Sequence, residues 1–303
     1  MKLKSFLQLH LSVFLFGFTA ILGDLIQLPT VSLVWWRVLL TAFFLLFLIN
    51  PFKIYKTISR SLLIRHVLIG VLVAIHWIAF YGSIKVANAS IVLIAVSTTS
   101  FITALVEPLM IKGKKWRAFD LVISILIIPA MLMIYYNASE VQQQGLWIGL
   151  IAAFVGAVFS VMNKMWLVDG KENEIVFIQQ TTVWVILSLV LVAFIVAGST
   201  GLEIPVGIDW FYLFVFAVGC TIIPYFLYLR SMKFLSAFDV SFAFNMEPVY
   251  GLIMAAWLLS DHQELSGKIY VGILFILIMV GMHTVLKSRK KIKARLKNMK
   301  SVI

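Results

Sequence analysis

The chain is divided into apolar segments that are each long enough to cross a lipid bilayer as a helix. About 20 apolar residues, rising about 1.5 Å each, span the hydrocarbon core. The segments occupy residues 6–23, 31–50, 64–84, 90–111, 118–136, 145–167, 175–198, 209–231, 237–259 and 266–287. Because lipid offers no hydrogen bonds to an exposed backbone, such segments must be helical. The sequence therefore predicts an all-α membrane protein with ten transmembrane helices.

The composition excludes a water-soluble domain. Of the 303 residues, 62% are hydrophobic and 13% are charged, and the mean hydropathy is +1.03. The sequence contains no Cys/His cluster with metal-ligand spacing and no glycine-rich phosphate loop, so we expect no metal, no cofactor and no soluble-type enzyme chemistry. The net charge of +12 could indicate nucleic acid, but the basic residues lie in short loops and in the tail. Membrane lipids, and not nucleic acid, are the expected partners.

The distribution of basic residues predicts the orientation in the membrane. If the N-terminus is cytoplasmic, 22 of the 25 Lys and Arg residues lie inside, Lys85 and Lys268 lie outside, and Arg37 lies within a segment. Because cytoplasmic loops are enriched in Lys and Arg, both termini are predicted to be cytoplasmic. The same orientation places the 112–117 loop inside, and the 137–145 and 199–209 loops outside.

A short internal repeat divides the chain into two halves. SIKVANASIVL at 83–93 aligns with SMKFLSAFDVS at 231–241 at an offset of 148 residues, with serine, lysine and alanine at matching positions. Each half then has five helices, and an odd number makes the two halves insert with opposite orientations. Inverted repeats of this kind are typical of secondary transporters. We expect two inverted five-helix repeats, 1–140 and 141–287, followed by a basic cytoplasmic tail, 288–303.

Glu247 is the most informative polar residue, because it lies at the middle of the segment 237–259. A charged group at a helix centre costs about 2.5 to 3.5 kcal/mol on insertion scales, and an intramembrane carboxylate usually marks a substrate or ion path. The alternative is a structural hydrogen bond to a neighbouring helix. Ala243 and Gly251 are expected to leave space around Glu247, and Pro248 is expected to free a backbone carbonyl nearby. We predict that Glu247 couples proton movement to substrate.

The first half offers hydroxyl groups at the equivalent level. At the offset of 148, Thr99 and Ser100 correspond to Glu247 and Pro248, so the predicted site is asymmetric. A second Glu-Pro pair begins at Glu107. Its carboxylate either contributes to function or pairs with the basic cluster that follows it.

Two further groups of polar residues lie inside predicted helices. His76, with Trp77 and Tyr81 near it, could relay protons and stack on a planar substrate, or could be a satisfied core histidine. Arg37 could bind a substrate carboxylate through bidentate hydrogen bonds, or could extend to the membrane interface beside its neighbouring tryptophans. Small residues repeat every fourth position from Gly145 to Ala157, which predicts close helix packing.

Several segments together resemble a known family. These are FLFGF in the first segment, LVWWRVLLTAF in the second, the SIKVANASIVL turn, and EPVYGLIMAAWLLSDHQELSGKIYVGILFILIMVGM near the end. They resemble the EamA branch of the drug/metabolite transporter superfamily. The resemblance implies a bacterial inner-membrane exporter or exchanger of amino acids or other small metabolites. It maps the family's ninth-helix proline onto Pro248, its second-helix arginine onto Arg37, and the acid closing the ninth helix onto Asp261. In the fourth helix, Thr99 and Ser100 replace the usual proline.

The resemblance also implies a central cavity lined by the third, fourth, eighth and ninth helices. The side chains predicted to face it are Trp77, Tyr81, Thr99, Tyr225 and Tyr228. The leading hypothesis is a secondary transporter that works by alternating access and is coupled to protons through Glu247. The alternatives are an uncoupled facilitator or channel, an intramembrane enzyme and a lipid-handling membrane protein. An intramembrane hydrolase would need a nucleophile paired with its base, and no spacing in the sequence provides such a pair.

Overall fold

The computed structural model describes residues 2–51, 54, 56, 58–116, 118–198, 201–244 and 246–258, together with a few positions between 267 and 282. Within these residues the chain is helical and contains no strand. Asp261, most of the tenth predicted segment, the side chain of Pro248 and the tail 288–303 lie outside the described residues. The predicted count of ten helices therefore stays a prediction.

The helices follow the predicted segments along the chain. Their bounds are α1 (Lys2–Leu25), α2 (Thr30–Leu46), α4 (Arg60–Val86), α5 (Ala89–Val96), α6 (Thr99–Met110), α7 (Ala118–Ile125), α8 (Ile127–Asn137), α9 (Glu140–Trp166), α10 (Glu172–Val196), α11 (Asp209–Ala217), the π-helical turn η1 (Val218–Ile222), α12 (Ile223–Met232), α13 (Ala237–Phe244) and α14 (Glu247–Leu258).

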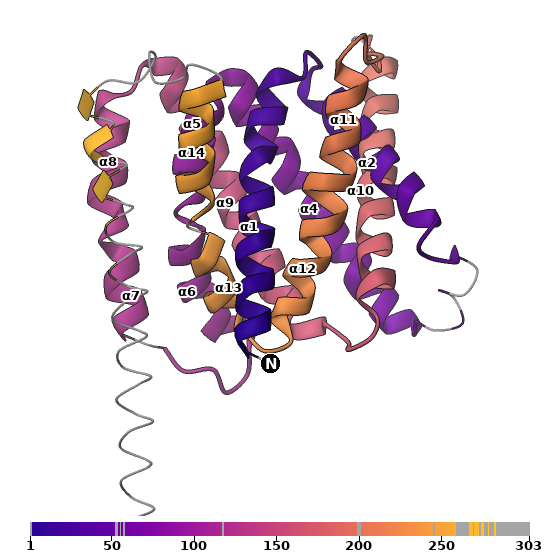
Figure 1. The fold of residues 1–303 in the computed structure, drawn as a ribbon, viewed down its shortest axis with the longest axis horizontal. Coiled ribbons are helices and arrows are strands. Elements are labelled where there is room, and N and C mark those ends of the chain that lie inside the picture. The colour runs from indigo at the N-terminus through magenta and orange to yellow at the C-terminus, as the bar shows by residue number, and fades with distance from the viewer. Residues whose placement is uncertain are drawn as a thin grey trace, which may run out of the picture.

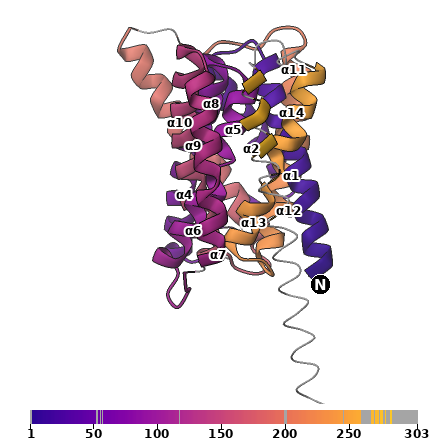
Figure 2. The same ribbon diagram turned by 90° about the vertical axis from the view of Figure 1, so that its left-hand side faces the viewer.

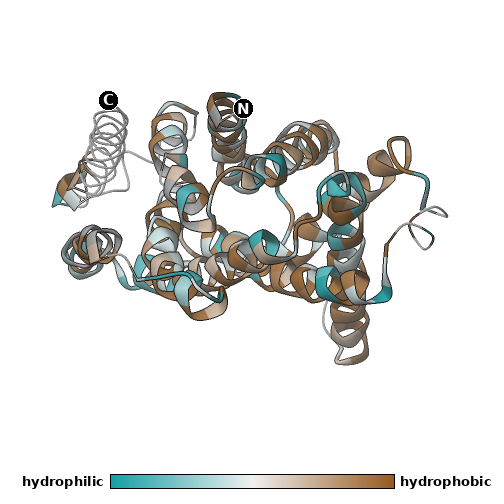
Figure 3. Ribbon diagram, turned by 90° about the horizontal axis from the view of Figure 1, so that it is seen from below, coloured by the Kyte–Doolittle hydropathy of each residue, from teal (hydrophilic) through white to brown (hydrophobic). Residues whose placement is uncertain are grey.

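The helices stand side by side along a common direction (Figures 1 and 2). Six helical stretches among the described residues are long and apolar enough to cross a membrane: Leu3–Leu25, Arg60–Val86, Ala89–Met110, Glu140–Trp166, Glu172–Val196 and Asp209–Met232. Large apolar side chains project from the bundle, including Phe47 at 75% and Trp257 at 83% exposure. Hydrophobic residues also dominate the helices seen from below (Figure 3). In lipid this surface is favourable, and the chain is a multi-pass membrane protein.

Polar capping residues set where two of the long helices begin. The Ser59 hydroxyl accepts a hydrogen bond from the Leu62 N–H at 3.3 Å at the start of α4. At the start of α9, Ser139 and Gln142 form a reciprocal capping box. These caps satisfy N–H groups that have no partner inside the helix. Both helices therefore begin before the apolar segments that predicted them.

The fourth predicted segment is broken into α5 and α6 at Ser97 and Thr98, although no proline lies there. The Ser97 hydroxyl donates to the Ile94 carbonyl at 2.6 Å, and the Thr98 hydroxyl donates to the Ala95 carbonyl at 2.7 Å. These bonds satisfy carbonyl groups at the end of α5 that a continuous helix would have satisfied through its backbone. Two hydroxyl residues thus form the interruption for which relatives are expected to use proline.

The ninth predicted segment is likewise divided, into α13 and α14. α6 begins at Thr99 and α14 begins at Glu247, so the two divisions are 148 positions apart. Pro248 lies in the first turn of α14, where a backbone N–H has no helical acceptor and its absence is harmless. α5 packs against α14 and α6 against α13, so the two breaks lie at a similar level (Figures 1 and 2).

The small residues of α9 bring it close to α4 and α5, as predicted. A Cβ atom added at Gly145 would lie 2.5 Å from the Cβ of Ala87, and one added at Gly149 would lie 2.6 Å from the Cβ of Ala95. The Ser83 hydroxyl donates to the Gly145 carbonyl at 2.7 Å. Glycine is therefore required at both positions for the observed helix separation.

Candidate functional site

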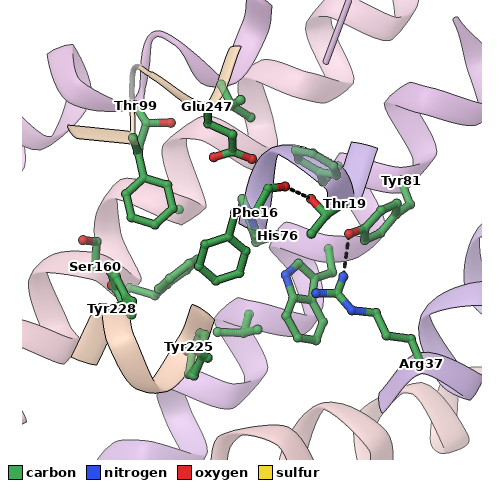
Figure 4. Close-up of a pocket in the computed structure, with 17 residues that line it drawn as sticks. Phe16, Thr19, Arg37, His76, Tyr81, Thr99, Ser160, Tyr225, Tyr228 and Glu247 are labelled. Atoms are coloured by element: carbon green, nitrogen blue, oxygen red, sulfur yellow. Dashed lines mark hydrogen bonds between the residues drawn. The ribbon is translucent and has the colours of Figure 1, made fainter. Parts of the chain in front are cut away.

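A cavity lies inside the bundle, next to both helix breaks, and contains about 840 Å³ of space free of protein atoms, part of it continuous with the outside. Its lining comes from α1, α2, α4, α5, α6, α9, α12, α13 and α14 (Figure 4). The lining residues are Phe16, Thr19, Arg37, Val73, His76, Trp77, Phe80, Tyr81, Val96, Thr99, Gly156, Phe159, Ser160, Tyr225, Tyr228, Phe244 and Glu247.

Most of the residues predicted to lie on a substrate path line this cavity. They are Arg37, His76, Trp77, Tyr81, Thr99, Tyr225, Tyr228 and Glu247. Ser100 is buried but does not line the cavity, because it faces away one position after Thr99. The side chain of Pro248 lies outside the described residues.

Arg37 is held inside the bundle, with 1% of its surface exposed. Its Nε donates to the Thr221 hydroxyl at 2.9 Å, and an Nη1 proton is donated to the Tyr81 hydroxyl at 2.5 Å. The guanidinium carbon lies 4.1 Å from the Trp77 ring centroid and 4.2 Å from that of Phe216. The alternative that Arg37 extends to the membrane interface is wrong, because these contacts draw the side chain inward. Stacking and hydrogen bonding fix the plane of the guanidinium.

A π-helical turn positions the hydrogen-bond partner of Arg37. The turn η1 interrupts the segment 209–231, and the Thr221 hydroxyl within it donates to the Phe216 carbonyl at 2.8 Å. A π turn inserts a residue into a helix and rotates the side chains that follow, and such turns often occur at functional sites. Here it places the Thr221 hydroxyl against the guanidinium group, on which the ring of Phe216 from α11 also packs.

Glu247 enters the cavity from the first residue of α14, and 8% of its surface is exposed. Among the described residues, no hydrogen bond or ion pair reaches its carboxylate, and none of the ion pairs includes Arg37. The expectation that Gly251 leaves space is wrong, because an added Cβ there would lie 2.5 Å from a methyl group of Leu93. Buried polar groups normally have partners, so a cavity that holds a guanidinium and a carboxyl group, not paired with each other, is suited to a ligand that can pair with both.

His76 combines a structural contact with exposure to the cavity. Its Nδ1 lies 2.7 Å from the Ala152 carbonyl oxygen. Because a carbonyl only accepts, Nδ1 carries a proton, and in the neutral ring Nε2 is an acceptor. The described residues make no hydrogen bond to Nε2. The alternative of a satisfied core histidine holds for Nδ1. His76 also lines the cavity, and its participation in a proton relay stays a prediction.

Aromatic rings form the walls between these polar groups. Phe16 lies 5.5 Å from Phe244, measured between ring centroids, and Tyr228 lies 5.7 Å from Phe244 in an edge-to-face arrangement. Such rings provide apolar contact area at low conformational cost. They favour a ligand with an apolar or planar body between its polar ends.

The sequence did not reveal the contributions of α1 and α9 to the cavity. Phe16 and Thr19 line it from α1, and Phe159 and Ser160 line it from α9. Aromatic and hydroxyl residues are common throughout membrane helices, so no pattern distinguishes these positions. Gly156 is the exception, because a glycine within an apolar helix can indicate a close neighbour. In the structure that neighbour is His76, whose Nδ1 would lie 3.2 Å from a Cβ atom added at Gly156.

Polar contacts join the helices at both ends of the bundle. At the end predicted to be cytoplasmic, the Glu107 carboxylate accepts from the Ala237 N–H at the start of α13 and pairs with Lys114, both at 3.1 Å. Glu107 thus pairs with the basic cluster that follows it and lies outside the cavity lining. Lys233 pairs with Asp169 at 3.3 Å and also with Glu172. The hydrogen bond to Glu172 raises the pKa of the Lys233 ammonium, so this group stays charged.

At the opposite end, Lys85 occupies the position equivalent to Lys233. Its ammonium donates to the Ile26 carbonyl at 2.6 Å, in the loop between α1 and α2. The Gln27 N–H in the same loop donates to the Asp209 carboxylate at 3.4 Å. Each lysine therefore holds the loop that follows the first helix of its own half of the chain.

Comparison with known sequences identifies a family for about half of the chain. A sequence profile of the EamA-like transporter family, which is part of the drug/metabolite transporter superfamily, matches residues 143–284. Residues 143–284 belong to the EamA-like transporter family. This EamA-like region supplies Ser160, Tyr225, Tyr228, Phe244 and Glu247 to the cavity. No curated protein matches the sequence at a significant level.

Solved structures share the fold. A protein structure described only as "Crystal structure of protein" matches with a TM-score of 0.66 at 12% sequence identity, over 94% of this chain and 99% of that chain. At this identity the match shows the fold and not the substrate. No group of three or more His, Cys, Asp or Glu side chains within the described ranges could hold a metal ion.

Proposed function

We propose that this membrane transporter is a secondary transporter that moves amino acids or related small metabolites across the bacterial inner membrane by alternating access. Export or exchange would be the direction implied by the family resemblance. One observation carries the proposal. Arg37 and Glu247 are both buried and line the same cavity, but they form no ion pair with each other. A zwitterion would satisfy both charges at once.

The hydrogen bonds of Arg37 leave part of its guanidinium group available to a ligand. Nε and Nη1 donate to Thr221 and Tyr81, and within the described residues no bond uses Nη2. A substrate carboxylate would bind there through charge-assisted hydrogen bonds. The substrate ammonium would lie toward Glu247, and the substrate side chain would lie among the aromatic walls. Glu247 would exchange its proton between the two orientations of the cycle and so couple proton movement to transport.

We propose further that the chain consists of two inverted five-helix repeats, 1–140 and 141–287, with both termini and the 288–303 tail in the cytoplasm. The matching helix breaks, which are 148 positions apart, support this arrangement. The equivalent lysines also support it, since Lys85 and Lys233 hold equivalent loops at opposite ends of the bundle. In alternating access, the contacts at one end would break while those at the other form.

The test is substrate binding followed by transport. Purified protein in detergent would be screened by thermal shift against amino acids, sugars and amines, and each ligand that stabilises it would be tested in proteoliposomes. We expect stabilisation by amino acids, and uptake of the same compounds. Arg37→Lys, which retains the charge but not the planar fork, should weaken binding of carboxylate-bearing ligands. Stabilisation by lipids alone, with no water-soluble ligand, would favour the lipid-handling alternative.

The enzyme alternative requires a nucleophile next to a base. Within the described residues no hydroxyl group is hydrogen-bonded to His76, and the profile match is to a family of transporters. A time-dependent chemical change of a bound ligand would nevertheless overturn the proposal. Transport with no response to an imposed pH gradient would instead indicate an uncoupled facilitator.

A further inference from the structure

The wall of the cavity opposite Arg37 carries polar atoms that the proposed headgroup site does not use. In Figure 4, Tyr228 and Ser160 lie across the cavity from Arg37 and Tyr81, with Phe16 between the two groups. Tyr228 is 4% exposed and Ser160 is 5% exposed. Both line the cavity.

The Tyr228 hydroxyl is buried without a hydrogen bond. It lies near the side chains of Ser160 and Asn163, but within the described residues it completes no hydrogen bond of normal geometry. Asn163 Nδ2 is also buried and has no hydrogen-bond partner among the described residues. Burying a polar group without a partner is unfavourable, so a group that binds in the cavity and supplies the missing bond gains affinity.

A buried network fixes which atoms face this wall. Tyr225 donates its hydroxyl proton to Gln179 Oε1 at 2.6 Å, and Gln179 Nε2 donates to Asn163 Oδ1 at 2.8 Å and to His66 Nδ1 at 2.9 Å. The His66 Nε2 lies 3.3 Å from the Trp166 carbonyl, to which it must donate. This fixes Nδ1 as an acceptor, so the amide of Gln179 has only one satisfactory orientation.

The orientation of the Gln179 amide also fixes the orientation of the Asn163 side-chain amide. Its oxygen accepts from Gln179, which assigns the other amide atom as Nδ2, a donor that has no acceptor among the described residues. The Asn163 side chain lies close to the Tyr228 hydroxyl, which also has no hydrogen-bond partner in the described part of the chain. The wall therefore presents a hydrogen-bond donor in an aromatic surrounding, and its complement is a neutral oxygen atom on the ligand.

We propose that Tyr228, backed by Asn163 and flanked by Ser160, forms a specificity subsite for a neutral oxygen, such as a hydroxyl or a carboxamide, at the end of the substrate that lies opposite its charged headgroup. This inference rests on the proposed transport function, since it assigns the far end of the same cavity. A site built to hydrogen-bond an oxygen discriminates against ligands that lack it, because the site's polar groups then remain unpaired.

The test uses pairs of ligands that differ only in one oxygen-containing group. Tyrosine is compared with phenylalanine, and glutamine with norleucine. The same para-hydroxyl difference is tested on an amine, tyramine against phenethylamine, and on an acid, 3-(4-hydroxyphenyl)propionate against 3-phenylpropionate. Dissociation constants are measured by titration with wild type, Tyr228→Phe and Tyr250→Phe. Tyr250→Phe is the control, because Tyr250 does not line the cavity.

We expect wild type and Tyr250→Phe to prefer the oxygen-bearing member of at least one pair by about tenfold. Tyr228→Phe should lose this preference by weakening the binding of that member alone. An equal preference in Tyr228→Phe and wild type, or no preference in wild type, would overturn the subsite. A preference seen only with amines or only with acids would support the subsite and refute the zwitterion proposal. Failure of every probe to bind wild type would refute both.

Discussion

Replacing Glu247 with glutamine separates binding from proton coupling. Glutamine keeps the volume and hydrogen-bonding capacity of the side chain but cannot titrate. Glu247 is the one carboxylate among the residues that the structure shows lining the cavity. Because it makes no ion pair with the described residues, its loss leaves no cation without a partner. The variant should therefore fold and insert. It should still bind substrate, though more weakly, because the glutamine carbonyl can accept from the substrate ammonium without the charge of a carboxylate.

The size of the effect follows from this single carboxylate. One titrating group carries at most one proton per cycle. A difference of one pH unit corresponds to about 1.36 kcal/mol for one proton, which equals about a tenfold ratio of substrate concentrations. With the membrane potential held at zero, the wild type should sustain up to about a tenfold substrate gradient per pH unit. Glu247→Gln should only equilibrate the substrate.

The assay is substrate accumulation in proteoliposomes with a pH difference imposed across the membrane. Accumulation on the acidic side would indicate exchange of substrate against protons, and accumulation on the alkaline side would indicate co-transport. Glu140→Gln is the control, because Glu140 is exposed at the start of α9 and outside the cavity. If Glu247→Gln sustained the same gradient per pH unit as the wild type, Glu247 would not be the coupling group.

Three further predictions concern packing, the headgroup site and topology. Gly149→Val should lower the stability in detergent by about 1 to 3 kcal/mol through overpacking, whereas Gly82→Ala, where the nearest atom would lie 3.8 Å from the added Cβ, should leave the melting temperature unchanged. Arg37→Lys should raise the Kd for amino acids by at least about tenfold through loss of charge-assisted bonds, measured by titration below the melting temperature, which should itself fall because the bonds to Thr221 and Tyr81 are lost. A cysteine at Ser301 should resist a membrane-impermeant reagent in intact cells, while one at Asn137 should react; the reverse pattern would refute the proposed topology.

The helical framework could be predicted from the sequence, because membrane insertion depends on local apolar length. The spacing from Gly145 to Ala157 also predicted close packing, since small residues allow helices to approach whatever their partners are. Glu247 and Arg37 were identifiable as candidate site residues because charged groups are rare in such segments. Their function in transport stays a prediction.

Other features depended on tertiary structure that no local pattern encodes. Ser97 and Thr98 break a helix here, but hydroxyl residues occur in many unbroken membrane helices. Gly251 indicated open space in the sequence, whereas a leucine from another helix fills that space. The sequence allowed Arg37 to point outward or inward. It points inward because it donates to the Thr221 hydroxyl, and Thr221 lies in a π-helical turn far along the chain.

The two helix breaks differ in the groups that interrupt the backbone hydrogen bonds. The first is held by the hydroxyl groups of Ser97 and Thr98, and rotation of a side chain can exchange such a bond for a backbone one. The second is followed by Pro248, which has no N–H and cannot complete a helical bond to the residue four positions earlier. The interruption between α5 and α6 should therefore yield more readily than the one before Pro248. We expect any flexing of these helices during transport to occur mainly between α5 and α6.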